Sequence, residues 1–498
     1  MMAQPDLITK KNHRLAIIIC IIAAIRVFIY SSAFPFFNNT DEQVHFDLVI
    51  KYSEGHIPKS LETISPVSAD YIVRYESKEF NENPDNYPGQ KFPSPIWKLP
   101  KENTQTYING GIALWTSHYN ENSLQAPLYY IVAGIWTKLG ILLGIKGGWL
   151  LYWIRDLNIL LIIVLVWIAY RAASMLFSDD QFIILGVPLM IALLPQDTFY
   201  SIQSDVMSPI CFGFAFIGMV RFMKNESPHP LKAIAAGLAT AATVFVKISN
   251  LPLFFVVLLT LLYLLLKSWR MKKLEQTRQP ILLFVFFAAI PVFTWFAWNQ
   301  YNYGDITASA EKIHRLGWSH KPVSEWFSHP IFTLQGAWTF WEGLMITFWR
   351  GEFTWWATSI GMRVADVFYC FSSLVFPLFA LLNMNKLKLE IQRKVNWFSF
   401  WCFASLILFM VTLSLSFDFG ACFYPSKDVP FFYSGRLISS ALVPFTFLFV
   451  QGLNLALSWI KIEKIRLSIL FLLFILISIS EITVNLPAFS SQFNLFHL

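Results

Sequence analysis

Long apolar stretches, separated by polar links, recur along almost the whole chain. A stretch of about 20 apolar residues is long enough to cross a bilayer as a helix. The first stretch runs from Leu15 to Phe37. The others cover residues 149–170, 181–200, 206–222, 231–246, 251–266, 280–298, 360–382, 397–417, 434–459 and 468–486. The pattern predicts an all-α polytopic membrane protein with about eleven transmembrane helices, forming a single membrane domain over residues 1–498.

Lysine and arginine are concentrated in every second link, and this sets the predicted orientation. Cytoplasmic links of membrane proteins carry an excess of these residues. The basic links are the N-terminal segment 10–14, the link that begins at Arg171, and the links at 221–232, 267–278, 386–394 and 461–466. We therefore expect a multi-pass protein of the cell membrane with a cytoplasmic N-terminus.

One further apolar stretch, residues 126–145, breaks this alternation if it crosses the membrane. Counting it as a span would move the basic links outside and Asp205 inside. We predict that it lies flat at the outer surface, with Tyr129, Tyr130 and Trp136 at the level of the lipid headgroups. The first extracytoplasmic loop then covers 38–148 and carries juxtamembrane helices, and a second long loop covers 299–359.

The composition agrees with a membrane protein and argues against other classes. Hydrophobic residues make up 55% of the chain and charged residues 14%, with a net charge of +7. Because the basic residues lie in the short links, membrane topology explains them and no nucleic-acid partner is expected. Cys20, Cys211, Cys370 and Cys402 lie in apolar runs and Cys422 stands alone in a loop, so the cysteines predict neither a disulfide framework nor a metal motif.

The first loop opens with the polar sequence "NNTDEQVHF" (38–46), which allows two interpretations. Thr40 and Gln43 have the spacing of a helix capping box, with acids in the first turn. Alternatively, Asp41 beside the membrane is a general base that takes a proton from an acceptor hydroxyl. His45 lies four residues further on and shares a helix face with Asp41. Such a pair can tune the acid's pKa, bind an anionic leaving group or ligate a divalent cation, which is therefore a candidate cofactor.

Four segments resemble known membrane glycosyltransferases. "TDEQVHF" resembles the Asp-Glu-x-His-Phe element in the first luminal loop of protein O-mannosyltransferases, with one extra residue before His45. "NSLQAPLYYIVAG" is similar to the His-Pro-Pro-Leu-Tyr-Tyr element of the aminoarabinose transferase family, with Gln125 and Ala126 in place of the His and the first Pro. "LLPQDTFYSIQSDVMSP" and "YSGRLISSALVPF" resemble elements of an uncharacterised bacterial branch, with Leu437 where Tyr is usual.

The resemblance implies a GT-C-type membrane glycosyltransferase. Such an enzyme transfers a sugar from a polyprenyl-phosphate donor to an extracytoplasmic acceptor, here a cell-envelope glycan, lipid or protein, with inversion at the anomeric carbon. Asp41 matches the family's base position, with Glu42 as its neighbour or substitute. His45, Tyr129 and Tyr433 lie in the matching motifs and are candidates for binding the substrate.

Three charged residues beyond the first loop are further candidates. Asp205 falls at the outer end of a span, where it faces a cavity or partner, or caps the following helix. Lys247 breaks the positive-inside pattern, which indicates a nearby anion such as a lipid phosphate, or simple snorkelling to the interface. Arg436 follows Gly435 at the outer end of a span, and its guanidinium together with backbone N–H groups is the preferred phosphate ligand.

Two other classes of function remain open from the sequence. A transporter or flippase of lipid-linked intermediates is disfavoured by the scarcity of charge inside the spans and by the lack of an internal repeat. A non-catalytic protein of envelope assembly would show much the same pattern, and Gln125 and Leu437 keep that alternative open. The glycosyltransferase interpretation requires Asp41, Asp205 and Arg436 to meet around one site.

Overall fold

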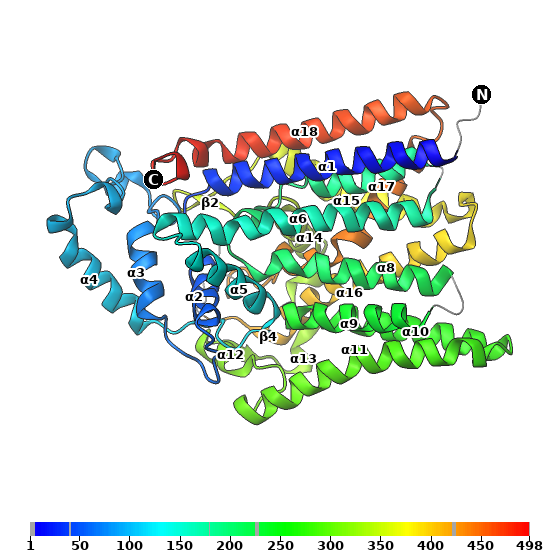
Figure 1. Ribbon diagram of the computed structural model, residues 1–498, viewed down its shortest axis with the longest axis horizontal. Coiled ribbons are helices and arrows are strands. Elements are labelled where there is room, and N and C mark those ends of the chain that lie inside the picture. The colour runs from blue at the N-terminus through cyan, green and yellow to red at the C-terminus, as the bar shows by residue number, and fades with distance from the viewer. Residues whose placement is uncertain (1–4, 39–40, 179, 225–228, 421–424, 498) are drawn as a thin grey trace.

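Helices make up nearly all of the regular structure, as the apolar stretches predict. The computed structural model describes residues 5–38, 41–178, 180–224, 229–420 and 425–497. Eleven of the helices in these residues run side by side as a bundle (Figure 1). They are α1 (Pro5–Ala33), α6 (Gly148–Leu176), α7 (Gln181–Ala192), α8 (Ser208–Lys224), α9 (Pro230–Val246), α10 (Leu251–Arg270), α11 (Leu274–Tyr303), α15 (Arg363–Leu382), α16 (Glu390–Ser416), α17 (Leu442–Ala456) and α18 (Glu463–Ser490).

The predicted fold class, an all-α polytopic membrane protein, is confirmed. Across the described parts of the chain, nine helical segments are long and apolar enough to cross a membrane. The bundle helices α7 and α9 are shorter, with 12 and 17 residues. The N-terminus and the C-terminus lie at opposite ends of the bundle (Figure 1), as an odd number of crossings requires.

The helix α7 ends eight residues earlier than the apolar pattern predicts, at Ala192 instead of residue 200. Pro195 explains the difference, because proline lacks the N–H that continues a helix and disfavours a helical conformation in the residue before it. The chain then turns through two short 3-10 segments, η4 (Asp197–Tyr200) and η5 (Ser204–Met207). These segments bring two carboxylates to the end of the bundle.

The two long loops form shorter elements at the end of the bundle that holds the C-terminus. We call this end the loop end and the other the N-terminal end. The first loop holds α2 (Glu42–Ser53), α3 (Pro66–Tyr75), α4 (Lys101–Ser117), α5 (Leu128–Leu142), η1 (Pro84–Asn86), η2 (Pro88–Gln90) and η3 (Ile96–Lys98). The second holds α12 (Ala310–Arg315), α13 (Val323–Trp326), η7 (Pro330–Phe332) and α14 (Leu334–Arg350). The remaining short helices are η6 (Ile248–Asn250), η8 (Met384–Lys386), η9 (Gly435–Ala441) and η10 (Leu495–His497).

Four two-residue strands complete the described structure as two small antiparallel pairs. The strand β1 (Ser319–His320) pairs with β4 (Phe417–Asp418), with Ser319 opposite Asp418. The strand β2 (Thr354–Trp355) pairs with β3 (Thr358–Ser359), with Thr354 opposite Ser359. The first pair attaches the second long loop to the end of α16.

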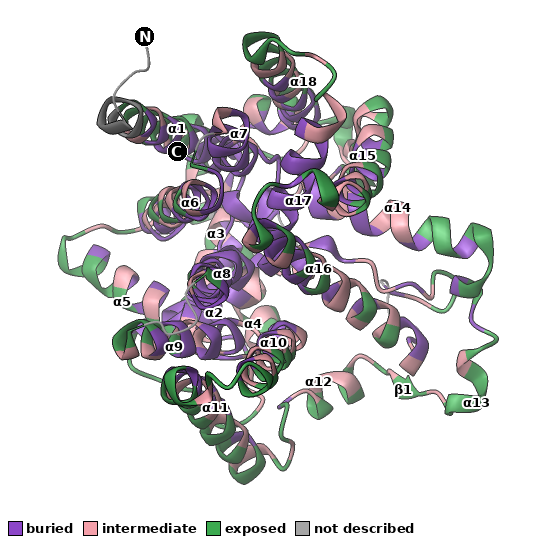
Figure 2. Ribbon diagram, turned by 90° about the vertical axis from the view of Figure 1, so that its right-hand side faces the viewer, coloured by how far each residue is buried: buried purple, intermediate pink, exposed green. Residues whose placement is uncertain are grey.

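The short helix α5 lies across the direction of the bundle (Figure 2) and packs on α2 and α6. The rings of Trp136 and Trp153 stack at 4.3 Å, and each indole N–H donates to the other residue's carbonyl, at 2.6 and 2.8 Å. Tyr129 and Tyr130 are only 1% and 0% exposed. Their predicted position at headgroup level is therefore wrong, because this face of α5 packs against the protein.

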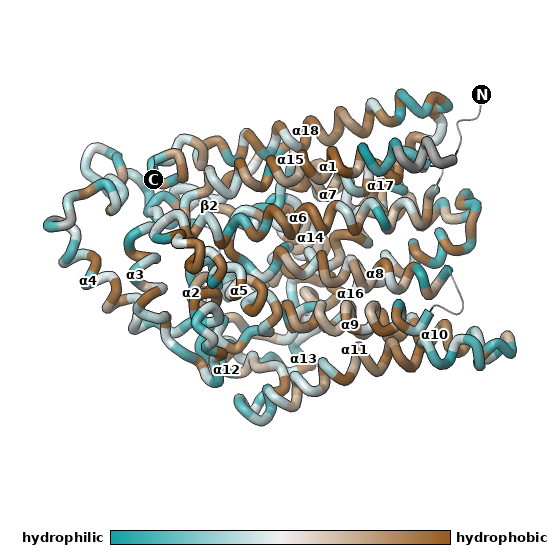
Figure 3. Tube along the Cα trace, viewed as in Figure 1, coloured by the Kyte–Doolittle hydropathy of each residue, from teal (hydrophilic) through white to brown (hydrophobic). Residues whose placement is uncertain are grey.

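The interior of the bundle is centred on α17. In the most apolar part of the span Gly435–Ala456, which contains α17, 94% of the residues are buried. The corresponding share for α11, at the edge of the bundle, is 22% (Figure 2). Apolar residues line the bundle helices, and hydrophilic ones gather at the two ends of the bundle, including the segments around α3 and α4 (Figure 3). The 3-10 segment η9 directly precedes α17, so residues of η9 are carried to the middle of the loop end.

Candidate functional site

Asp41 precedes α2 in a backbone conformation that is unusual for a residue with a side chain. Its φ of 64° and ψ of 9° are left-handed, and its carboxylate makes no capping hydrogen bond to the helix. This conformation costs an L-residue roughly 1–2 kcal/mol, although Asp tolerates it better than most. Arg436 instead donates from Nη2 to Oδ2 of Asp41 at 2.6 Å. Asp41 thus holds the N-cap position without capping the helix through its side chain, and Thr40, the cap of the predicted capping box, lies outside the described residues.

Arg436 reaches Asp41 from η9, across 395 positions of sequence. Its side chain is 13% exposed, and its Nε lies 3.4 Å from Oγ of Ser434 and 3.6 Å from Oε2 of Glu352. The expected meeting of Asp41 and Arg436 is confirmed. The N–H of Gly435 donates to Oγ1 of Thr347 at 2.8 Å, so this backbone group is already engaged and is not one of those expected to hold a phosphate with Arg436.

Gly435 allows η9 to lie directly against α14. A Cβ at this position would fall 2.0 Å from the backbone nitrogen of Phe348, so no larger residue fits. Tyr433 packs on the same helix, where its ring covers Gly343 and its carbonyl accepts from Oγ1 of Thr347 at 2.7 Å. The motif "YSGR" is therefore first a packing motif, and its consequence is the placement of Arg436.

Asp205 and Lys247 form a second ion pair at the loop end. Nζ of Lys247 donates to both carboxylate oxygens of Asp205, at 2.7 and 2.8 Å. Their side chains are 1% and 12% exposed, so Lys247 does not snorkel to the interface, and Asp205 is not a helix cap because Gln203 holds that position. The sequence predicted an anion near Lys247, such as a lipid phosphate, and in the structure the carboxylate of Asp205 is the anion that contacts it. The segment η5, which carries Asp205, packs against η9, which carries Arg436, so both ion pairs lie in one cluster.

The cluster controls the protonation of Asp41. Burial alone would raise the pKa of this carboxyl group, but the positive charge of Arg436, followed by Lys312 and His45, holds the pKa well below its usual range. The Asp41 side chain is nonetheless 41% exposed. Asp41 is therefore an accessible, ionised carboxylate whose basicity is suppressed by the cation beside it.

Glu42, the neighbour of Asp41, occupies a different environment. Its side chain is fully buried, and Arg155 donates to both of its oxygens, at 2.8 and 2.7 Å. The backbone N–H groups of Phe37 and Ile202 also donate to it, at 2.8 and 2.9 Å. Since both oxygens are occupied, Glu42 is not available as a base. The expectation that Glu42 could substitute for Asp41 as the base is therefore wrong. Glu42 instead holds the start of α2 in position.

We expect Glu42→Gln to destabilise the protein by about 3 kcal/mol, because it leaves the buried guanidinium of Arg155 without its counter-ion. The measurement is thermal unfolding in detergent. Asp70→Asn is the control, since it breaks the half-exposed pair with Arg74 and should change the stability by less than about 1 kcal/mol. Equal shifts for the two variants would contradict the structural role of Glu42.

A chain of hydrogen bonds fixes the orientation of His45. Nζ of Lys312 can only donate, and it donates to Oδ1 of Asn122 at 2.9 Å. Nε2 of Gln125 donates to the same oxygen at 2.7 Å, which leaves Oε1 of Gln125 to accept from the Tyr130 hydroxyl at 2.9 Å. The Tyr130 oxygen then accepts from Nδ1 of His45 at 2.7 Å. Nε2 of His45 is therefore the nitrogen that carries the lone pair.

Two buried aromatic side chains of the first loop complete this part of the site. Burial lowers the pKa of His45 to about 3, against the opposing pull of Asp41, so the imidazole is neutral at physiological pH. The hydroxyl of Tyr129, one residue before Tyr130, accepts from the backbone N–H of Gln203. Tyr129 thus joins α5 to the segment that carries Asp205, and it contributes packing rather than an open hydroxyl.

The sequence analysis missed three charged groups of the site. Glu352 accepts from the Ser434 hydroxyl and lies beside Arg436. Asp197 accepts from the N–H of Glu352 at 3.0 Å, and burial, followed by the charge of Glu352, raises its pKa to about 7. Lys312 is the third. Asp197 lies within a motif already singled out, two residues after Pro195, but the apolar pattern assigned it to a span.

Comparison with known proteins gives one match. The family described as "Predicted membrane protein (DUF2142)" matches residues 20–420, which is more than half of the chain. The chain belongs to this family. The DUF2142 match contains Asp41, His45, Asp205 and Lys247, whereas Arg436 follows it. No curated protein and no solved structure matches the chain.

The described residues of this DUF2142 chain hold no group of three or more His, Cys, Asp or Glu side chains that could bind a metal ion. A divalent cation at the site would use Asp41 or Glu352 together with oxygens of a bound substrate. Two histidines of the second loop, His329 and His320, contact other residues. His329 bonds to the carbonyl of Pro430 at 3.0 Å, and the ring of His320 packs on Phe417 at 4.5 Å.

Proposed function

We propose that this chain is a GT-C-type glycosyltransferase that moves a sugar from a polyprenyl-phosphate donor to a cell-envelope acceptor on the extracytoplasmic side of the membrane. The observation that carries the proposal is the ion pair between Asp41 and Arg436. It combines an accessible carboxylate with a largely buried guanidinium, at the end of the bundle opposite the basic links. The positive-inside rule assigns that end to the extracytoplasmic side.

The two groups match the two charges that change during glycosyl transfer. Asp41 takes the proton from the acceptor hydroxyl, whose oxygen bonds to the anomeric carbon of the sugar. The bond from that carbon to the phosphate oxygen breaks on the opposite face, so the polyprenyl phosphate leaves with the electron pair and the configuration inverts. Arg436 stabilises the charge that develops on the leaving phosphate.

The pairing of Asp41 with Arg436 supports an exchange of partners. Arg436 neutralises Asp41 and suppresses its basicity. A donor phosphate competes for the guanidinium, since Arg binds phosphate and carboxylate with the same planar fork. The pKa of Asp41 then rises toward its ordinary value when the donor binds, which makes the carboxylate a better base at that moment.

The neighbouring groups have supporting roles in this proposal. The neutral Nε2 of His45 accepts a hydrogen bond from a sugar or acceptor hydroxyl. The Asp205–Lys247 pair keeps positive charge close to the phosphate without leaving an unpaired buried ion. Tyr129 and Tyr433 hold the elements that carry Asp205 and Arg436.

One observation bears on the transporter alternative. Arg26 of α1 and Glu481 of α18 form a buried ion pair inside the bundle, at 2.5 Å. This pair is an exception to the expected scarcity of charge in the spans. However, Arg26 also donates to the carbonyls of Ala192 and Leu194. A pair that also fastens α1 to the end of α7 is better suited to holding helices than to releasing a substrate.

The test is to incubate purified protein with a panel of polyprenyl-phosphate sugars and an envelope acceptor fraction, with and without a chelator. We expect one donor to release polyprenyl phosphate in step with glycosylated acceptor. The Glu481→Gln variant should retain this activity, because Glu481 pairs with Arg26 inside the bundle and lies outside the proposed site. Movement of intact donor across proteoliposomes, without cleavage, would instead establish the flippase alternative.

A further inference from the structure

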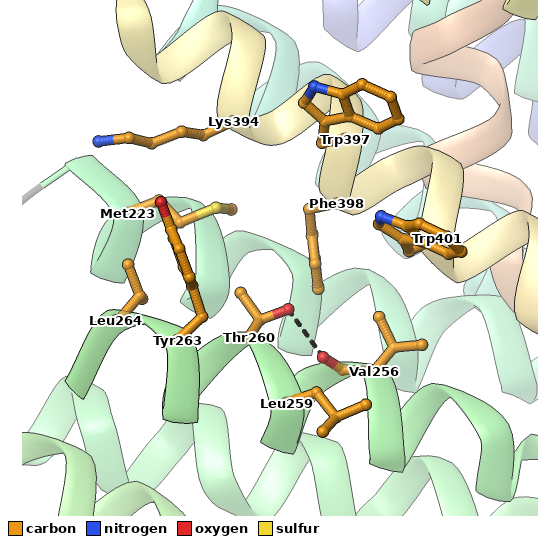
Figure 4. A pocket seen from close by; sticks show the side chains of 10 residues that line it. All are labelled: Met223, Val256, Leu259, Thr260, Tyr263, Leu264, Lys394, Trp397, Phe398 and Trp401. Carbon is orange, nitrogen blue, oxygen red and sulfur yellow. Dashed lines mark hydrogen bonds between the residues drawn. The ribbon is translucent and has the colours of Figure 1, made fainter. Parts of the chain in front are cut away.

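A groove lies away from the site, towards the N-terminal end of the bundle, between α8, α10 and α16. Its volume is about 550 Å³, and Leu259, Tyr263, Trp397 and Trp401 are among its lining side chains (Figure 4). These four side chains are 47–64% exposed. The Thr260 hydroxyl in the groove donates to the carbonyl of Val256 at 2.7 Å, so it is satisfied within its own helix. The groove therefore offers apolar surface and little hydrogen bonding.

A polar pocket of about 260 Å³ continues from this groove, with Met223, Leu264 and Lys394 lining both. Its charged side chains are Lys224, Lys267, Glu390 and Lys394. Oε1 of Glu390 lies 2.9 Å from Nζ of Lys394 and 3.5 Å from Nζ of Lys267. Three ammonium groups against one carboxylate give these side chains a net charge of about +2, counted from their ordinary ionisation.

The combination identifies the kind of ligand. An apolar groove that opens into a basic pocket matches an amphiphile with an anionic head, because the acyl chain avoids water and the phosphate meets the ammonium groups. Glu390 holds Lys267 and Lys394 side by side, and each ammonium has three donors, so donors remain for a phosphate. Basic pockets between helices at the cytoplasmic surface are known to bind anionic lipid head groups.

We propose that this groove and pocket bind one anionic glycerophospholipid. An acyl chain lies along Tyr263, Trp397 and Trp401, and the phosphate is held by Lys267 and Lys394 with Lys224 beside them. The location differs from that of the proposed donor phosphate. Lys247 precedes α10 at the loop end, whereas Lys267 lies near the other end of the same helix. The proposal therefore does not depend on glycosyltransferase activity.

The experiment is native mass spectrometry of the purified full chain in detergent, titrated with phosphatidylglycerol or with phosphatidylcholine of the same acyl chains. We expect one phosphatidylglycerol to bind more tightly than phosphatidylcholine. The double variant Lys267→Gln with Lys394→Gln should lower the phosphatidylglycerol affinity by about fivefold for each charge removed, and leave phosphatidylcholine unchanged. The matched control is Lys461→Gln with Lys464→Gln, two exposed lysines at the same end of the bundle.

A second variant tests the groove by itself. Leu259→Trp places a larger side chain in the groove at a position that is 64% exposed, so the fold tolerates it. It should weaken the binding of phosphatidylglycerol although every lysine is retained. Equal affinities of the wild type for the two lipids would overturn the proposal. So would equal losses in the pocket variant and the control variant, or full binding by Leu259→Trp.

Discussion

Replacing Arg436 with glutamine is expected to lower sugar transfer from the polyprenyl-phosphate donor by about 10³-fold, which is the upper range for removing one group that stabilises transition-state charge. Arg436 is the largely buried cation that faces the accessible carboxylate of Asp41, and it also lies beside Ser434 and Glu352. Arg436→Lys keeps the charge but loses the planar fork, so it should recover only part of the activity. The measurement is the release of polyprenyl phosphate by purified protein.

The pH dependence separates this role from a purely structural one. Arg436 lowers the pKa of Asp41 in the free protein, so kcat/KM should show no acid limb from Asp41 until well below pH 4. The donor phosphate draws Arg436 away, so the acid limb of kcat should lie at higher pH. In the Arg436→Gln variant, the acid limbs of kcat/KM and of kcat should both move to higher pH and coincide. Unchanged profiles in the variant would contradict the exchange of partners.

The number and order of the bundle helices could be predicted from the sequence because each apolar stretch must match the thickness of the bilayer. The charge of the links also identified α5 as a helix that does not continue the alternation. The end of α7 could not be predicted by this rule. Leu193 and Leu194 continue the apolar stretch, but Pro195 follows them, and contacts with Arg26 of α1 and with α14 hold the segment where the helix stops.

The site was predictable in part because a few residue types are costly at a membrane boundary. Asp41, Asp205, Lys247 and Arg436 stand out for that reason, and they lie in one cluster. The sequence does not distinguish Asp41 from Glu42, because adjacent residues on a helix differ by about 100° in direction and only the partners reveal which one is buried. Asp197, Lys312 and Glu352 come from irregular segments whose position depends on tertiary contacts.

Gln125 shows how the structure changes the interpretation of a mismatch. In the sequence it is a departure from the His of related motifs, and it weakened the case for an enzyme. In the structure the amide of Gln125 donates to the same Asn122 oxygen as Lys312 and accepts from the Tyr130 hydroxyl. Tyr130 is therefore left to accept from His45. The departure is compatible with function, because the side chain still fixes which nitrogen of His45 carries a lone pair.

Asp41→Asn is expected to reduce sugar transfer by about 10³-fold, within the range for removing a general base. The variant should fold normally for two reasons. Asn tolerates the left-handed conformation at this position at least as well as Asp, and its amide oxygen can still accept from Arg436. The product and the released polyprenyl phosphate are measured together with thermal stability. Glu54→Gln, at the other end of α2 and exposed, is the matched control and should keep full activity.

Three results of this comparison have different meanings. Loss of transfer with unchanged stability supports the base, because Arg436 remains to hold the phosphate. Tighter donor binding is also expected, since the neutral amide competes less than the carboxylate for the guanidinium of Arg436. Wild-type transfer by Asp41→Asn would contradict the assignment, and the strained backbone of residue 41 would then serve only to hold α2 against η9. The combination of lost transfer and tighter donor binding is specific to a base that is paired with the phosphate ligand, because a mutation that merely loosened the fold would weaken both.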